Sequence, residues 1–207
     1  KQIFEGLGKE SAFLWGARQT GKSTLLKALY PGSLYFDLLL GNEFERFQRN
    51  PSLLREIVSA AVISGPVIVD EIQRIPELLN EIHWLIENEK CQFILSGSSP
   101  RKILRSGGNL LGGRAIRYEL YPLVYKEIPD FNLLTALNNG LLPRHYLASS
   151  PDKLISAYIG SYLRDEIMAE AKIRNISSFS RFLEMAAFSN GEIVNYSNIA
   201  ADCGVSA

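Results

Sequence analysis

Short apolar runs alternate with longer amphipathic stretches along most of the chain. The apolar runs have the length of strands and cover residues 11–15, 33–39, 67–69, 91–99 and 115–120. Between them, apolar side chains recur at helical spacing in residues 23–30, 42–50, 51–61 and 76–90. The run at 67–69 is wholly β-branched, as expected of a parallel strand that is buried on both faces. This alternation predicts an α/β domain built on a parallel sheet.

The pattern changes after residue 128. Prolines, glycines and paired polar residues interrupt residues 129–150, and helical spacing returns in 151–171 and 176–190. The apolar face of the second of these helices predicts a small core made of Phe179, Phe182, Leu183, Ala186 and Ala187. We therefore expect a first domain over 1–128, a linker over 129–150 and a smaller all-α domain over 151–207.

The last residues have the order of a partial helix-turn-helix. Ser197 is expected to cap a short helix, Gly204 permits a tight turn, and Ser206 would cap a recognition helix. The chain ends at Ala207, so we expect a truncated, winged-helix-like fragment that lacks the recognition helix. DNA and protein remain alternative partners for this region in a longer chain.

Composition narrows the class of protein. The net charge is zero, so no basic field over the whole chain indicates nucleic acid or an anionic membrane. No apolar stretch is long enough to span a bilayer, so no membrane association is expected. The two cysteines, Cys91 and Cys203, have neither metal-ligand spacing nor a disulfide framework. This usage fits a reducing compartment and predicts a cytoplasmic protein.

The strongest motif lies between the first predicted strand and the first predicted helix. It fits the P-loop pattern G-x-x-x-x-G-K-[ST] and consists of Gly16, Ala17, Arg18, Gln19, Thr20, Gly21, Lys22, Ser23 and Thr24. The glycines let successive backbone N–H groups wrap a polyphosphate at the start of the helix. Lys22 is expected to reach the β- and γ-phosphates, and the Ser23 hydroxyl to hold Mg²⁺.

Two adjacent carboxylates end the buried run at 67–69. Asp70 is expected to hold Mg²⁺ through its water shell, and Glu71 to activate the water that attacks the γ-phosphate, which together make a Walker B element. An acidic exit from a strand is the structural alternative. The second carboxylate favours hydrolysis over transfer, so a small-molecule P-loop kinase is the weaker alternative.

Other candidates follow the fourth predicted strand. Ser96 and Ser98 are alternative sensors of the γ-phosphate, and the sequence does not choose between them. Arg114 ends a glycine-rich loop at 106–114, where its guanidinium could reach a γ-phosphate in the same subunit or in a neighbour, or simply lie on the surface. Arg101 and Arg105 are weaker candidates for that role. His83 is interpreted as structural or exposed, because no metal-ligand spacing surrounds it.

These motifs, in their order, carry a family resemblance. The segments GARQTGKST, VIVDEIQRIP, FILSGSS and LLGGRAIRYELYPLVYKEI resemble a prokaryotic family of AAA-type ATPases, similar to the AAA+ and STAND groups, whose C-terminal half is a domain of unknown function. The resemblance implies a three-layer P-loop sandwich with sheet order 5-1-4-3-2. It also implies matching roles for Lys22, Ser23, Asp70, Glu71, a sensor serine and Arg114.

Two functional hypotheses follow. The first is a Mg²⁺-dependent ATPase, in which the nucleotide state moves the C-terminal helical domain and a homo-oligomer supplies Arg114 in trans. The second is a nucleotide-gated switch that holds ATP or ADP with little turnover and engages DNA or protein. ATP is favoured over GTP by the resemblance and by the missing N-K-x-D motif of GTPases.

Overall fold

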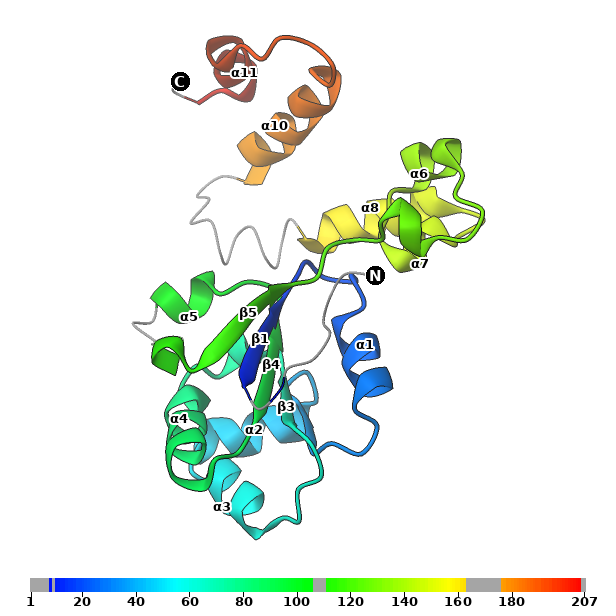
Figure 1. Ribbon diagram of the computed structural model, residues 1–207. Helices are drawn as coiled ribbons and strands as arrows, with labels where there is room; N and C mark the ends of the chain where they lie inside the picture. Colours follow the sequence, from blue (N-terminus) through cyan, green and yellow to red (C-terminus); the bar gives the residue numbers. More distant parts are fainter. Residues whose placement is uncertain (1–7, 9, 106–110, 163–175, 206–207) are drawn as a thin grey trace. The chain divides into compact units, whose positions relative to one another are not determined.

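The apolar runs of the sequence form one five-stranded parallel sheet in the computed structural model (Figure 1). The strands are β1 (Ser11–Trp15), β2 (Tyr35–Asp37), β3 (Val67–Asp70), β4 (Phe93–Gly97) and β5 (Ala115–Glu119). Their order is β2-β3-β4-β1-β5, which confirms the predicted order 5-1-4-3-2. β2 is shorter than the expected run at 33–39 because a turn follows it, in which the Leu40 N–H donates to the Asp37 carbonyl.

Helices cover both faces of the sheet, as Figure 1 shows. On one face α1 (Lys22–Leu29) buries Leu26 against side chains of β1, β3 and β4. The other face is covered by α2 (Gly41–Arg49), α3 (Leu53–Ala60), α4 (Leu78–Glu89) and the short α5 (Arg101–Arg105). The predicted apolar faces of α3 and α4 pack there, and their buried residues are Leu54, Val58, Leu78, Leu79, Ile82 and Leu85. The first unit is therefore the predicted three-layer α/β sandwich.

The strand register sets the place of the polar residues. Trp15 at the end of β1 lies opposite Gly97 of β4, and Asp70 at the end of β3 lies opposite Ser96 of β4. Because all the strands are parallel, the segments that leave β1, β3 and β4 begin at one edge of the sheet. Ligands of open α/β sheets bind at this carboxyl edge.

The structure describes residues 8, 10–105, 111–162 and 176–205, and its two compact units are residues 1–148 and 149–207. The expected linker at 129–150 contains two short helices, α6 (Leu133–Asn139) and α7 (Pro143–Tyr146). The buried Asn139 side chain joins them, since its amide donates to the carbonyls of His145, Tyr146 and Ala148 over 3.1 to 3.3 Å. Side-chain hydrogen bonds therefore order a segment whose sequence lacks periodicity.

The second unit contains α8 (Pro151–Tyr162), α10 (Ile176–Phe188) and α11 (Tyr196–Cys203). Ser197 does not cap α11, contrary to the prediction; Asn195 does, because its side chain accepts the Asn198 N–H over 3.1 Å. Gly204 takes the left-handed conformation expected of a turn glycine, with φ 67°. Residues 163–171 of the longer expected helix and the expected cap Ser206 lie outside the described residues.

The core predicted for α10 forms only in part. Phe182 is 42% exposed, and Ala186 and Ala187 are exposed, whereas Ala200 and Cys203 of α11 are buried. The helix that packs on α10 has only eight residues, so it cannot cover the whole apolar face of a thirteen-residue helix. None of the helices in the described ranges is long and apolar enough to cross a membrane.

Candidate functional site

The loop between β1 and α1 needs glycine at two positions. A Cβ at Gly16 would lie 2.3 Å from the carbonyl oxygen of Leu120, and the Gly16 N–H donates to the Gly97 carbonyl over 3.3 Å. Gly21 has φ 94°, a left-handed conformation that glycine adopts without a steric penalty, and it caps α1. The loop is therefore fixed by backbone sterics at both ends, and it leads directly into the N-terminus of α1, where backbone N–H groups favour anions.

The side chain of Lys22 lies back over this loop. Its Nζ donates to the carbonyls of Gly16 and Ala17 over 2.6 and 3.0 Å, and the residue is buried. The Thr20 hydroxyl donates to the same Ala17 carbonyl over 2.9 Å. The carbonyls of Gly16 and Ala17 thus hold the Lys22 ammonium group against the loop.

Asp70 is the centre of the hydrogen-bond network at the carboxyl edge. Its Oδ2 accepts from the Ser23 hydroxyl over 2.5 Å, although the two residues are 47 positions apart in the chain. Its Oδ1 accepts from the Ser96 hydroxyl and from the Glu71 N–H. A carboxylate beside a serine hydroxyl is a pair of hard oxygen donors, which is the kind of ligand that Mg²⁺ takes in proteins. The residues present therefore fit the expected ion.

Tyr35 is a member of this network that sequence reasoning missed. Its hydroxyl donates to Asp70 Oδ2 over 2.6 Å from the neighbouring strand β2. Burial raises the pKa of Tyr35 well above its ordinary value, and the hydrogen bond to Asp70 adds to the shift. In the sequence Tyr35 is one aromatic residue in an apolar run, so no pattern signalled its contact.

Glu71 follows the carboxyl end of β3 in a strained backbone conformation. Its φ of 62° and ψ of 41° lie in the left-handed region, which is uncommon for a residue other than glycine. Burial raises the pKa of the Glu71 carboxyl, and the charge of Lys22 and a hydrogen bond from Gln73 act in the opposite direction. Glu71 thus lies within electrostatic reach of the loop lysine, as the Walker B interpretation requires.

The two candidate serines have different surroundings. Ser96 is fully buried, and its hydroxyl is engaged by Asp70. Ser98 is partly exposed, and its hydroxyl accepts from Gln73 Nε2 over 3.3 Å. Ser96 is therefore placed to orient Asp70, whereas Ser98 lies nearer the open side of the edge.

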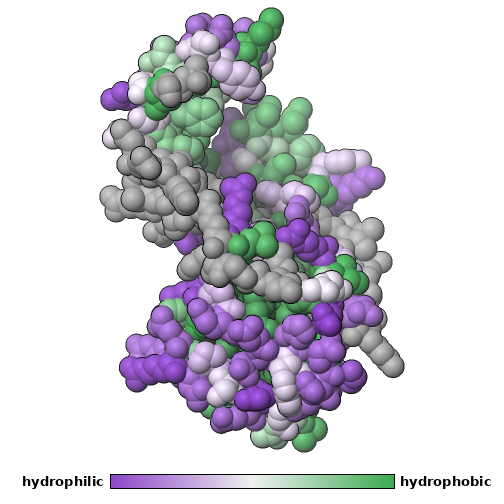
Figure 2. All heavy atoms as spheres, turned by 90° about the vertical axis from the view of Figure 1, so that its left-hand side faces the viewer, coloured by the Kyte–Doolittle hydropathy of each residue, from purple (hydrophilic) through white to green (hydrophobic). Residues whose placement is uncertain are grey.

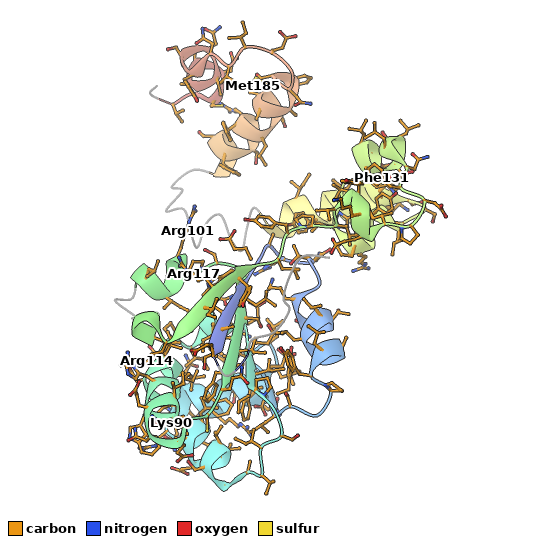
Figure 3. The ribbon with its side chains drawn as sticks, in the orientation of Figure 1. Lys90, Arg101, Arg114, Arg117, Phe131 and Met185 are labelled. Atoms are coloured by element: carbon orange, nitrogen blue, oxygen red, sulfur yellow. The ribbon has the colours of Figure 1, made fainter. Side chains whose placement is uncertain are left out.

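Arg114 lies at the other edge of the sheet. Arg114 comes directly before β5, whose first residue, Ala115, pairs with Ser11 at the start of β1. The loop, in contrast, begins after Trp15 at the end of β1. A strand rises about 3.3 Å per residue, so about 15 Å of sheet separates the two edges. Arg114 lies beside α4 (Figure 3), and its guanidinium pairs with Glu87 of that helix. Arg114 is therefore remote from the loop of its own subunit, and its catalytic role stays a prediction.

The remaining candidates are Arg101, Arg105 and His83. Arg101 is exposed at the start of α5, after the carboxyl end of β4 (Figure 3). Nothing is described of the Arg105 side chain, and residues 106–110 of the glycine-rich loop lie outside the described residues. His83 lines a shallow pocket on α4 with Asn80, Trp84, Glu87 and Asn88. Within the described ranges, no cluster of three histidine, cysteine or acidic side chains could hold a metal ion.

Comparisons with known proteins divide the chain into two parts. A family model described as an AAA domain matches residues 9–129, which is more than half of the 207 residues. A second model, described as a domain of unknown function (DUF8612), matches residues 131–207. No protein of curated function matches the chain. The first match confirms the resemblance carried by the motifs and indicates a nucleotide-binding domain of the AAA-type ATPases.

Proposed function

This chain belongs to the AAA domain family, and from that membership we propose that it binds ATP together with Mg²⁺ and hydrolyses it. One observation carries the proposal. The Ser23 hydroxyl donates a hydrogen bond of 2.5 Å to the Asp70 carboxylate beside the loop, although the two residues are 47 positions apart in the chain. The pair places two hard oxygen donors beside the loop, which supports a Mg²⁺ site there.

We assign the roles as follows. The loop backbone and Lys22 bind the phosphates, Ser23 and Asp70 hold Mg²⁺, and Glu71 accepts a proton from the attacking water. When held by Ser23 and Asp70, Mg²⁺ would neutralise negative charge on the phosphate oxygens. Ser96 orients Asp70, and the partly exposed Ser98 is our choice for the phosphate sensor.

Arg114 serves a neighbouring copy in this proposal. Its position at the amino edge keeps it from the nucleotide of its own subunit, and its side chain is accessible on the face that carries α4. Hydrophilic side chains predominate on the lower part of the face seen in Figure 2. An arginine supplied in trans stabilises charge on the transferred phosphoryl group, so the active ATPase is a homo-oligomer.

The second candidate function is a nucleotide-gated switch with little turnover. It is favoured by the internal hydrogen bonds of Lys22 and Asp70, which nucleotide and ion have to displace on binding. In both functions the nucleotide state is passed to the helical C-terminal unit, which engages DNA or another protein.

Phosphate release from ATP, measured with Mg²⁺ over a wide range of protein concentration, separates the two functions. A rate per molecule that rises with concentration supports the oligomeric ATPase. Tight ATP binding without phosphate release supports the switch. Absence of ATP binding, checked by calorimetry, contradicts both.

A further inference from the structure

Gln73 lies between the general base of the proposed reaction and the end of the neighbouring strand. It belongs to the 3₁₀ turn Ile72–Arg74 that follows Glu71, and it is 8% exposed. Its Nε2 donates to Glu71 Oε2 over 2.5 Å and to the Ser98 hydroxyl over 3.3 Å. One amide group thus connects the residue after β3 with the segment that leaves β4.

The carbonyl half of the same amide has no such partner. Gln73 Oε1 is buried and makes no hydrogen bond to any of the described residues. A Cβ at position 97 would lie 2.1 Å from it, so the amide fits only because Gly97 has no side chain. A buried carbonyl without a hydrogen bond destabilises the fold, and an apolar side chain of equal length would avoid this cost. Packing alone therefore does not account for an amide here.

The orientation of the amide follows from its neighbour. A carboxylate accepts hydrogen bonds, so only the NH₂ group of Gln73 pairs with Glu71. Glu71 itself has a left-handed backbone, which costs energy unless surrounding contacts hold it. The hydrogen bond from Gln73 favours the turn that follows Glu71 and the observed direction of the Glu71 carboxylate.

We propose that Gln73 is a positioning residue, which holds the Glu71 carboxylate toward the loop and ties it to Ser98 at the end of β4. The inference rests on the proposed role of Glu71 in ATP hydrolysis. Because Gln73 is hydrogen-bonded to both residues, a displacement of Ser98 by bound nucleotide would also move the Glu71 carboxylate. Gln73 touches neither phosphate nor water in this role.

The test compares Gln73→Met with the wild-type chain. Methionine has nearly the same length and volume but has no donor for Glu71. We expect kcat to fall by about tenfold to a hundredfold, since a small misplacement of a catalytic group has an effect of that size. KM and the ATP dissociation constant should not change. The matched control is Gln48→Met on the exposed side of α2, which should leave kcat unchanged.

A double mutant distinguishes positioning from a general structural effect. In a Glu71→Gln background, Gln73→Met should cause no further loss of turnover, because the group that it positions is already absent. The melting temperature of Gln73→Met should change little, because the substitution removes the unpaired carbonyl together with the hydrogen bond to Glu71. A wild-type kcat, or the same loss in both backgrounds, overturns the proposal.

Crystal structures of wild-type and Gln73→Met chains provide a readout that does not need turnover. We expect the Glu71 carboxylate to leave its wild-type position in the variant, with the loop of residues 16–24 unmoved. An unmoved carboxylate contradicts the positioning role even if ATP is hydrolysed. A wild-type chain without turnover contradicts only the proposed hydrolysis, and the displacement of Glu71 still decides the role of Gln73.

Discussion

Charged side chains are buried at one edge of the parallel sheet and exposed to solvent at the other. At the carboxyl edge, Asp70 is buried and accepts from three hydroxyls that belong to α1, β2 and β4. At the amino edge, Arg114 and Glu87 form an ion pair whose side chains are each about two-fifths exposed, at 41% and 44%. A buried charge has to be fully hydrogen-bonded, whereas an exposed pair is solvated with or without its partner. Substitutions at the carboxyl edge should therefore have large effects, and those at the amino edge small ones.

The largest effect is expected from Glu71→Gln. The amide keeps the size of the side chain but cannot accept a proton, so kcat should fall by about 10²- to 10⁴-fold while ATP still binds. Phosphate release and calorimetry measure the two quantities separately. Glu77→Gln, an exposed position at the start of α4, is the control. Unchanged turnover in Glu71→Gln would remove Glu71 from the mechanism.

Lys22→Ala should weaken ATP binding by about 100-fold, because hydrogen bonds to charged groups contribute about 1.5–3 kcal/mol each. The fold should survive, since the loop conformation is set by Gly16 and Gly21. Calorimetry with ATP and far-ultraviolet circular dichroism check both points. Lys90→Ala, an exposed lysine after α4, should bind as the wild type does. Wild-type affinity in Lys22→Ala would be incompatible with the P-loop assignment.

Arg114→Ala tests whether the amino edge acts on a second copy. Turnover at high protein concentration should fall to the rate per molecule seen at low concentration, and ATP affinity should not change. Glu87→Gln removes the same ion pair but keeps the arginine, so it should retain the concentration dependence. If Arg114→Ala loses turnover equally at all concentrations, the effect does not come from a neighbouring subunit.

Tyr35→Phe removes a hydroxyl that donates to Asp70 Oδ2 and keeps the ring. The free energy of unfolding should decrease by about 1–3 kcal/mol, as for other hydrogen bonds to a charged group. Urea denaturation measures the change. Tyr125→Phe, whose ring is 62% exposed, provides the comparison and should be close to neutral. Equal stability of the two variants would show that the Tyr35 hydroxyl does not support Asp70.

The smallest effect is expected from the ion pair at the amino edge. Its partner Arg114 lowers the pKa of Glu87, so the pair stabilises the fold above the ordinary carboxyl pKa and loses this effect as pH falls through the lowered value. Because both side chains are exposed, water and salt screen the attraction. The urea midpoint of Glu87→Gln should therefore match that of the wild type at physiological salt. A clear shift would indicate that this edge is less solvated than its exposure implies.

The sequence alone determined the order of elements and located the P-loop motif at residues 16–24. The apolar runs and amphipathic stretches predicted every strand of the sheet and the helices α1 to α4, because burial imposes the periods of strands and helices on the chain. The loop was recognisable because its glycines, lysine and serine lie at fixed spacings within eight residues, Gly16 to Ser23. The sequence was less informative for α10, whose apolar residues Phe182, Ala186 and Ala187 are exposed. A sequence pattern identifies an apolar helix face, but it does not show how much of that face the neighbouring helix covers.

Only the tertiary structure decided which side chains meet. Tyr35, Asp70 and Ser96 come from three strands, and their contacts depend on strand register, because a shift by one residue turns each side chain to the opposite face. In this register the Ser96 hydroxyl donates to Asp70. The Gln73 amide contacts both Glu71 and Ser98. Arg114 precedes β5 in the chain. This position places it at the amino edge of the sheet because all five strands are parallel. Local pattern identifies groups that are neighbours in the chain, whereas contacts between distant groups arise from the packing of the whole sheet.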